Sequence, residues 1–108
     1  MQRGDVVSVA VQGDLGKPRP ALVVQGDWFA KHPSVTVLPL TSDLHDSPML
    51  RVTVQPSPQN GLAKASQVMV DKTITVRREK IGPVIGQLEA DRMIEIERCL
   101  AVFLGIAK

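Results

Sequence analysis

The chain consists of short apolar runs separated by turn-forming clusters, followed by one segment whose apolar residues recur at a longer spacing. Six runs rich in Val, Ile, Leu and Thr have the length and composition of β-strands. Gly, Pro, Asn and Asp gather between them, as they do in turns. Several short strands at close spacing predict a small antiparallel barrel or sandwich. The predicted strands span residues 6–11, 21–24, 35–40, 50–54, 65–70 and 73–76.

The pattern changes towards the C-terminus. Residues 83–86 (Pro-Val-Ile-Gly) predict a short helical or 3₁₀ connection. From Asp91 to Leu104 the apolar residues recur at helical spacing, with charged residues on the other faces. Acidic residues precede this segment and Gly105 follows it, where helices commonly start and stop. We therefore expect one C-terminal helix that covers one end or face of the sheet.

Composition limits the class of protein. A chain of 108 residues with 44% hydrophobic residues is expected to form a single domain over residues 1–108. The net charge of +2 permits a nucleic-acid partner without requiring one. No apolar run is long enough to span a membrane and no secretion signal is present, so no membrane contact and a cytoplasmic location are expected. Cys99 is the only cysteine, and its place in the apolar helical pattern indicates a packed thiol.

The motifs of common cofactor enzymes are missing from the chain. It has no phosphate-binding glycine loop, no dinucleotide fingerprint and no Gly-x-Ser-x-Gly nucleophile elbow. His32 and His45 lie in polar loops without Cys or Glu at metal-ligand spacing, although either histidine could act as a general base. We therefore expect a protein without cofactor or metal.

Arg19 is the candidate centre of the chemistry. It stands between Pro18 and Pro20, which restrict the backbone, and a guanidinium held in this way near Thr41 and Ser42 suits a phosphate. Cleavage of RNA by its own 2′-hydroxyl needs only in-line geometry, stabilisation of the phosphorane charge and proton transfer.

A structural role for these residues is the alternative. Arg19 could pair with Asp5 or Asp14, and a Thr-Ser pair after a strand often forms a turn or a helix N-cap. The carboxylates left as candidates for the chemistry are Asp5, Asp43 and Asp71.

Several segments in order resemble the MazF/PemK (Kid) family of toxin endoribonucleases. They are Arg3-Gly4-Asp5-Val6-Val7, Arg19-Pro20-Ala21-Leu22-Val23-Val24, Pro39-Leu40-Thr41-Ser42 and Ser66-Gln67-Val68-Met69-Val70-Asp71, and the match continues to residue 106. The resemblance implies a Src-homology-3-like, MazF/CcdB-type barrel with a C-terminal helix, which forms a homodimer and cleaves single-stranded RNA without a metal. It assigns Arg19 to the phosphate and Thr41 to positioning or relaying a proton, with Ser42 beside it.

The resemblance and the charge pattern also predict binding residues and partners. The residues expected to contact RNA are Lys17, Pro20, Asp43, Arg51, Lys64 and Asp71. The implied protein partner is a MazE/PemI-like antitoxin with an acidic, disordered tail, and operator DNA is bound only through the complex with that antitoxin. Trp28 and Phe29, in a predicted loop, either lie in a dimer interface or cap the barrel.

Some positions depart from the family pattern. Kid-like members carry an arginine that assists the chemistry two residues before the conserved acid, where this chain has Met69. Lys72 and Ile74 also replace the family's Gln and Arg. Two other functions stay open. One is a CcdB-like toxin that binds DNA gyrase, disfavoured because the last residues are Leu104-Gly105-Ile106-Ala107-Lys108, without the Trp of that class. The other is a degenerate member that only binds antitoxin or DNA.

Overall fold

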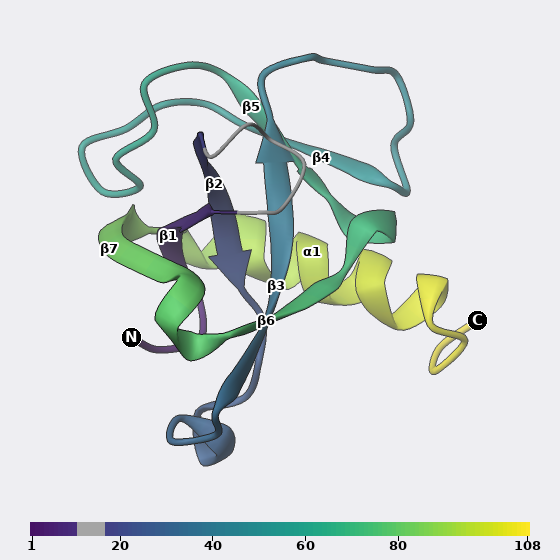
Figure 1. The fold of residues 1–108 in the computed structure, drawn as a ribbon. Coiled ribbons are helices and arrows are strands. Elements are labelled where there is room, and N and C mark those ends of the chain that lie inside the picture. Colours follow the sequence, from purple (N-terminus) through teal and green to yellow (C-terminus); the bar gives the residue numbers. More distant parts are fainter. Residues whose placement is uncertain (11–16) are drawn as a thin grey trace.

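A computed structural model describes residues 1–10 and 17–108, which form a curled antiparallel sheet with one helix packed against it (Figure 1). The helix, α1, spans Ala90–Phe103. Three single-turn 3₁₀ helices connect strands: η1 (Asp27–Phe29), η2 (Val70–Lys72) and η3 (Arg78–Lys80). The strands are β1 (Asp5–Ala10), β2 (Pro18–Val23), β3 (Ser34–Thr41), β4 (Arg51–Val54), β5 (Ser66–Met69), β6 (Ile74–Arg77) and β7 (Ile81–Gln87).

Six of the seven strands pair in the order β4-β5-β3-β2-β1-β7, and the seventh, β6, pairs with β3. Because β6 lies against β3 and β7 against β1, the segment from β6 through η3 to β7 crosses from one strand to the other and curls the sheet. The predicted mainly β, barrel-like fold with a C-terminal helix is confirmed. Among the described strands the hydrogen-bonded order stays open, so the sheet is not a closed barrel.

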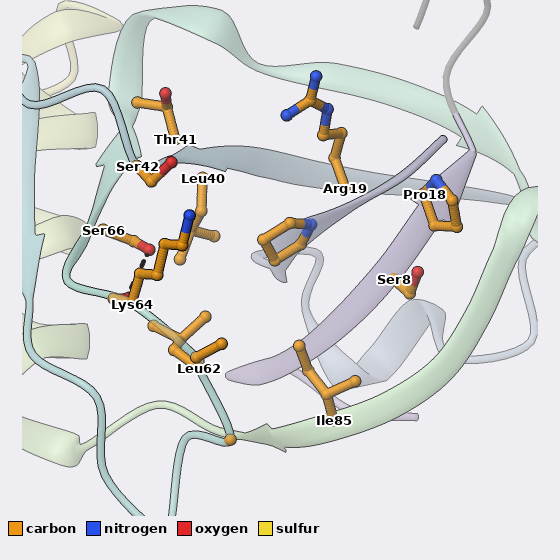
Figure 2. Close-up of a pocket in the computed structure, with 13 residues that line it drawn as sticks. Ser8, Pro18, Arg19, Leu40, Thr41, Ser42, Leu62, Lys64, Ser66 and Ile85 are labelled. Atoms are coloured by element: carbon orange, nitrogen blue, oxygen red, sulfur yellow. Dashed lines mark hydrogen bonds between the residues drawn. The ribbon is translucent and has the colours of Figure 1, made fainter. Parts of the chain in front are cut away.

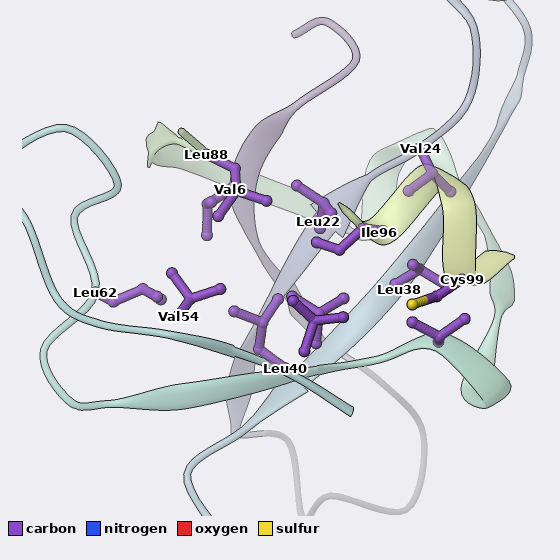
Figure 3. Close-up of a cluster of buried hydrophobic side chains, with 13 residues drawn as sticks. Val6, Leu22, Val24, Leu38, Leu40, Val54, Leu62, Leu88, Ile96 and Cys99 are labelled. Atoms are coloured by element: carbon purple, nitrogen blue, oxygen red, sulfur yellow. The ribbon is translucent and has the colours of Figure 1, made fainter. Parts of the chain in front are cut away.

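Two clusters of buried side chains lie on opposite faces of the central strands. Neighbouring residues such as Val6 and Val7 belong to different clusters, as the alternation of side chains along a strand requires. Strands buried on both faces have continuous apolar runs, which is why the central runs of this sequence alternate so little. The cluster beneath α1 includes Leu22, Leu38, Ile96 and Cys99 (Figure 3). The second cluster is Val7, Val9, Ala21, Val23, Val35 and Val37, flanked by side chains of β6 and β7.

The expectation of a helical connection at residues 83–86 is wrong, because these residues lie within β7. β7 pairs with β1 through an irregular register that shifts twice, between Val6 and Val7 and between Val7 and Val9. Such shifts accommodate a proline that has no N–H to donate and two glycines that weaken regular pairing. The strand was not recognisable because its few apolar residues do not alternate.

The C-terminal helix is confirmed, and its end follows from local chemistry. Gly105 adopts a φ of +77°, a left-handed conformation that glycine adopts at little cost. Its N–H donates to the carbonyl of Val102 at 3.1 Å, and the N–H of Ile106 donates to the carbonyl of Ala101 at 2.8 Å. These two bonds form a Schellman motif, which stops the helix where the glycine predicted.

Trp28 and Phe29 lie in η1, between β2 and β3, at the end of these strands opposite to Arg19 (Figure 1). Trp28 is 91% exposed and Phe29 is 55% exposed. The alternative in which they cap the barrel is therefore wrong for this monomer.

Candidate functional site

Arg19 and Thr41 lie near one another, at the start of β2 and the end of β3. The antiparallel register of β2 and β3 pairs Ala21 with Pro39. Arg19 and Thr41 each lie two residues beyond this pair, where the β2–β3 ladder has ended and Thr41 pairs with Gln67 of β5. Residues two apart on a strand share a face. Arg19 therefore lies on the same face as Ala21, and Thr41 on the same face as Val37, at the solvent-exposed end of the second cluster. The pairing of two consecutive strands thus joins residues that are far apart in the sequence.

A pocket of about 330 Å³ opens beside this pair. Arg19, Thr41, Ser42 and Lys64 line it together with Pro20. Figure 2 places the guanidinium of Arg19 and the hydroxyl of Thr41 on the same side of the pocket, and Lys64 extends towards Ser42. The structure therefore brings together five residues that the sequence analysis had selected.

The pocket carries positive charge. Of the described residues that line it, two are cations, Arg19 and Lys64, and none is acidic. The remaining lining is small or apolar, including Ser8, Leu62 and Ile85. Two cationic side chains around a concave surface suit a phosphodiester, which is anionic and accepts hydrogen bonds.

The hydroxyl of Thr41 is oriented by the chain that follows it. The backbone N–H of Asp43 donates to Oγ1 of Thr41 at 3.0 Å, so the hydroxyl accepts this bond and keeps its own hydrogen to donate. The carboxylate of Asp43 turns away to His45, with 3.2 Å between Oδ2 and Nε2. Asp43 thus contributes its backbone to the site and is absent from the residues that line the pocket.

Gln67 holds the loop between β3 and β4. It pairs with Thr41 in the β3–β5 ladder and is only 5% exposed. Its side-chain amide donates to the carbonyl of His45 and accepts from the N–H of His45, both at 2.9 Å. Sequence reasoning missed this role, because Gln67 entered only as part of the family motif. A glutamine beside the apolar Val68, Met69 and Val70 was the available signal, since a buried amide needs partners.

The segment that carries Leu62 and Lys64 to the pocket is held by a buried asparagine. Asn60 is fully buried, and its Oδ1 accepts from the N–H groups of Ser57 at 3.1 Å and Leu62 at 3.0 Å. Its Nδ2 donates to the carbonyl of Gln55 at 2.9 Å and to Oε1 of Glu89 at 3.0 Å. All four hydrogen-bonding positions of the amide are therefore satisfied.

Glu89 and two glycines complete this anchor. The hydroxyl of Ser57 donates to Oε2 of Glu89 at 2.6 Å. This hydrogen bond, together with the one from Asn60, lowers the pKa of Glu89, although burial by itself would raise that pKa. A Cβ on Gly61 would lie 1.9 Å from the carbonyl oxygen of Ile85, and one on Gly86 would lie 2.2 Å from the carbonyl carbon of Asn60. Glycine at these positions thus lets the segment approach β7, which forms the opposite wall of the pocket.

Replacing Asn60 with alanine is expected to lower the free energy of unfolding by about 2–4 kcal/mol, because it leaves buried polar groups of the segment without partners. Urea denaturation of the purified protein measures this loss. Gln55→Ala is the matched control: it removes an exposed amide from the same segment and is expected to change stability by less than about 0.5 kcal/mol. Equal stability of Asn60→Ala and wild type would contradict the anchoring role.

Arg51 and Asp71 lie outside the pocket and bind each other. Nη1 of Arg51, on β4, donates to Oδ1 of Asp71, on η2, and the two side chains are only 15% and 21% exposed. Burial by itself would raise the pKa of Asp71, but the hydrogen bond and charge of Arg51 outweigh it and lower that pKa. The pair ties η2 to the edge of the sheet.

The other predicted residues are placed as follows. Lys17 is exposed, next to β2, and does not line the pocket. Asp5 accepts from the N–H of Gln2 at 2.8 Å and lies at the other end of β1 from Val9, which pairs with Arg19. Asp14 and most of the loop at residues 12–17 lie outside the described residues.

Residues that could hold a metal are dispersed. Within residues 1–10 and 17–108, no three His, Cys, Asp or Glu side chains gather at one place. Cys99 is buried beneath the sheet. This burial raises the pKa of its thiol, and the charge of Glu95 raises it further.

Among residues 1–10 and 17–108, no helix has the length and hydropathy needed to cross a membrane.

Comparison with known proteins identifies the class that this fold and pocket define. Residues 2–104 match the family described as PemK-like, MazF-like toxins of type II toxin–antitoxin systems. The chain is 44% identical over 108 residues to a protein of Mycolicibacterium smegmatis named probable endoribonuclease MazF, covering 99% of each chain. The protein therefore belongs to the PemK/MazF family of toxins, as its sequence motifs predicted.

Solved structures share this fold. An endoribonuclease from a mycobacterial species, solved in complex with its cognate antitoxin, matches with a TM-score of 0.84 and 25% identity, covering 100% of this chain and 98% of that chain. The Mycobacterium tuberculosis toxin MazF-mt6 matches in fold with a TM-score of 0.82 and 24% identity, covering 96% of this chain and 99% of that chain. A MazF from Deinococcus radiodurans, solved with MazE, has a TM-score of 0.80 and 21% identity, with 99% and 97% of the chains covered.

Proposed function

We propose that this protein is the toxin of a type II toxin–antitoxin system and cleaves single-stranded RNA, arresting translation and growth. The observation that carries the proposal is the joint position of Arg19 and Thr41 at a pocket that Lys64 and Ser42 also line. Membership of the PemK/MazF family supports the same activity.

The reaction that fits this pocket is transesterification by the RNA itself. The 2′-oxygen of a ribose forms a bond to the adjacent phosphorus, and the bond from phosphorus to the 5′-oxygen of the next nucleotide breaks. The 2′-hydroxyl loses its proton and the leaving 5′-oxygen gains one, giving a 2′,3′-cyclic phosphate and a 5′-hydroxyl. Arg19 lies where its guanidinium stabilises the charge that develops on the phosphorane oxygens, and Thr41 donates a hydrogen bond to the same group.

The partners follow from the charge of the site. Lys64, Arg19 and the exposed Lys17 form a basic surface onto which an acidic antitoxin tail folds, excluding RNA. We also propose that the toxin acts as a homodimer in the cytoplasm, and that it reaches operator DNA only as part of the antitoxin complex. The exposed aromatic pair of η1, Trp28 and Phe29, is one apolar surface available to a second copy.

Incubation of the purified toxin with mixed-sequence RNA in EDTA tests the activity. We expect discrete cleavage products with cyclic phosphate and 5′-hydroxyl ends, which ligation and end-labelling chemistry distinguish from other termini. Supercoiling by DNA gyrase, measured in parallel, is expected to be unaffected. Intact RNA together with inhibited gyrase would instead support the CcdB-like function.

A further inference from the structure

Gln67 lies in a row of polar residues that crosses three neighbouring strands. It pairs with Thr41 of β3 on one side and with Thr53 of β4 on the other. Residues directly opposite one another in a ladder share a face of the sheet, so the three side chains lie on the same face. Gln67 does not line the pocket that contains Arg19 and Thr41. Any effect of its side chain on the site therefore passes through the residues that it contacts.

The buried amide of Gln67 makes three hydrogen bonds. Nε2 donates to the carbonyl of His45 at 2.9 Å and to Oγ1 of Thr53 at 3.1 Å. Oε1 accepts from the backbone N–H of His45 at 2.9 Å. One side chain thus holds both backbone groups of His45, as the facing residue of an antiparallel strand does in a hydrogen-bonded pair.

The loop segment from Ser42 to Asp46 has few other contacts. Its side chains are all exposed, so no buried side chain holds it. In the described part of the chain, no backbone–backbone hydrogen bond outside the strands and helices involves this segment. What remains is the bond from the N–H of Asp43 to Oγ1 of Thr41, at 3.0 Å, and the contact between Asp43 and His45, at 3.2 Å. Together with Gln67, these bonds close a ring that begins and ends at Thr41.

We propose that Gln67 is a positioning residue for RNA cleavage, which holds His45 and thereby keeps the N–H of Asp43 on the hydroxyl of Thr41. This inference rests on the proposed function. A hydroxyl that accepts from a fixed N–H has its own hydrogen directed elsewhere, here towards the pocket. A donor that is oriented before the reaction stabilises the developing charge better than one that must first rotate. Gln67 therefore affects the rate of the chemical step rather than the binding of RNA.

Replacing Gln67 with methionine tests the proposal, because methionine has a similar length and makes none of the three bonds. The groups that it releases, on His45 and Thr53, belong to exposed residues and are open to water. We expect kcat to fall about 10-fold with KM within about 2-fold of wild type. Binding to a 2′-O-methyl RNA, which lacks the nucleophile, is expected to stay unchanged. Thr53→Val is the matched control: it removes only the bond to β4 and is expected to keep the wild-type kcat.

A double-mutant cycle separates positioning from a general structural role. In Thr41→Val no hydroxyl remains to be oriented, so adding Gln67→Met is expected to lower kcat by less than about 2-fold. Effects that multiply, or a loss of kcat that only follows a lower melting temperature, would overturn the inference. Asp43→Pro removes the N–H itself at an exposed position, without altering the sheet. It is expected to lower kcat by about 10-fold, and a wild-type rate would equally overturn the inference.

Amide hydrogen exchange tests the same positions without cleavage. The N–H of Asp43 is expected to exchange about 3- to 10-fold faster in Gln67→Met than in wild type, the effect of weakening one hydrogen bond. Its exchange is expected to be unchanged in Thr53→Val. Faster exchange in a protein that cleaves no RNA would retain the positioning of Asp43 by Gln67 and reject the nuclease. Unchanged exchange and unchanged kcat in a protein that cleaves RNA would reject the role of Gln67 and retain the nuclease.

Discussion

Replacing Arg19 with alanine is expected to lower the rate of RNA cleavage by about 10²–10³-fold, the usual effect of removing one preorganised donor to a developing charge. The side chain is exposed at the edge of the pocket and lies outside both buried clusters, so the melting temperature is expected to stay within about 2 °C of wild type. Single-turnover cleavage of a defined RNA and a thermal melt of the same preparation measure both quantities.

Two companion variants sharpen this experiment. Arg19→Lys retains the charge but loses the planar fork, so its rate is expected to fall between those of Arg19→Ala and wild type. Lys31→Ala removes an exposed cation at the opposite end of β2 and β3 and is expected to cleave RNA at the wild-type rate. If Arg19→Ala stays folded and fully active, the proposed site is wrong, and His32, His45 and Asp71 become the next candidates.

Thr41→Val is expected to reduce kcat by about 10²-fold with little change in RNA affinity, because the hydroxyl acts mainly in the transition state. Valine keeps the shape of the side chain at this half-buried end of β3. It removes only the acceptor of the Asp43 N–H, in an exposed loop, so the stability loss is expected to stay below about 1 kcal/mol. Steady-state cleavage and binding to 2′-O-methyl RNA separate the two effects.

Thr36→Val is the matched control for this variant. It removes a hydroxyl from the same strand, where Thr36 bonds to Thr75 across the β3–β6 ladder at 2.7 Å. Its cleavage rate is expected to equal that of wild type. A loss of activity by Thr41→Val that only follows a lower melting temperature would instead assign Thr41 a structural role as a turn residue.

The part of the site that the sequence predicted is the part formed by consecutive strands. Arg19 and Thr41 lie on β2 and β3, which are joined by one short connection, so the antiparallel pairing of neighbours brings them together. Lys64 was chosen for its charge alone, and it reaches the pocket through the segment that Asn60 and Glu89 anchor. No local pattern predicts that anchor, because its bonds from Ser57 and Asn60 to Glu89 join residues 32 and 29 positions apart.

Local chemistry determined much of the fold. Six of the strands and the helix were predicted from the apolar pattern. Gly105 marked the end of the helix, because glycine adopts the left-handed backbone conformation there with little steric cost. The family motifs, likewise a property of the sequence, gave the class of protein that the comparisons support.

Tertiary structure decided what depends on partners. β7 forms a strand because it pairs with β1, although its two glycines and its proline disfavour a strand locally. Arg51 and Asp71 were selected as separate RNA-binding candidates, and only the packing of β4 against η2 shows that they form an ion pair with each other. A pocket of about 430 Å³ between Arg19, Met69 and Ile74 lies where β3 changes its neighbour from β6 to β5. Turns and helix ends depend on interactions among a few neighbouring residues, so the sequence predicts them. Strand partners and buried polar networks depend on the packing of the whole chain, so only the tertiary structure determines them.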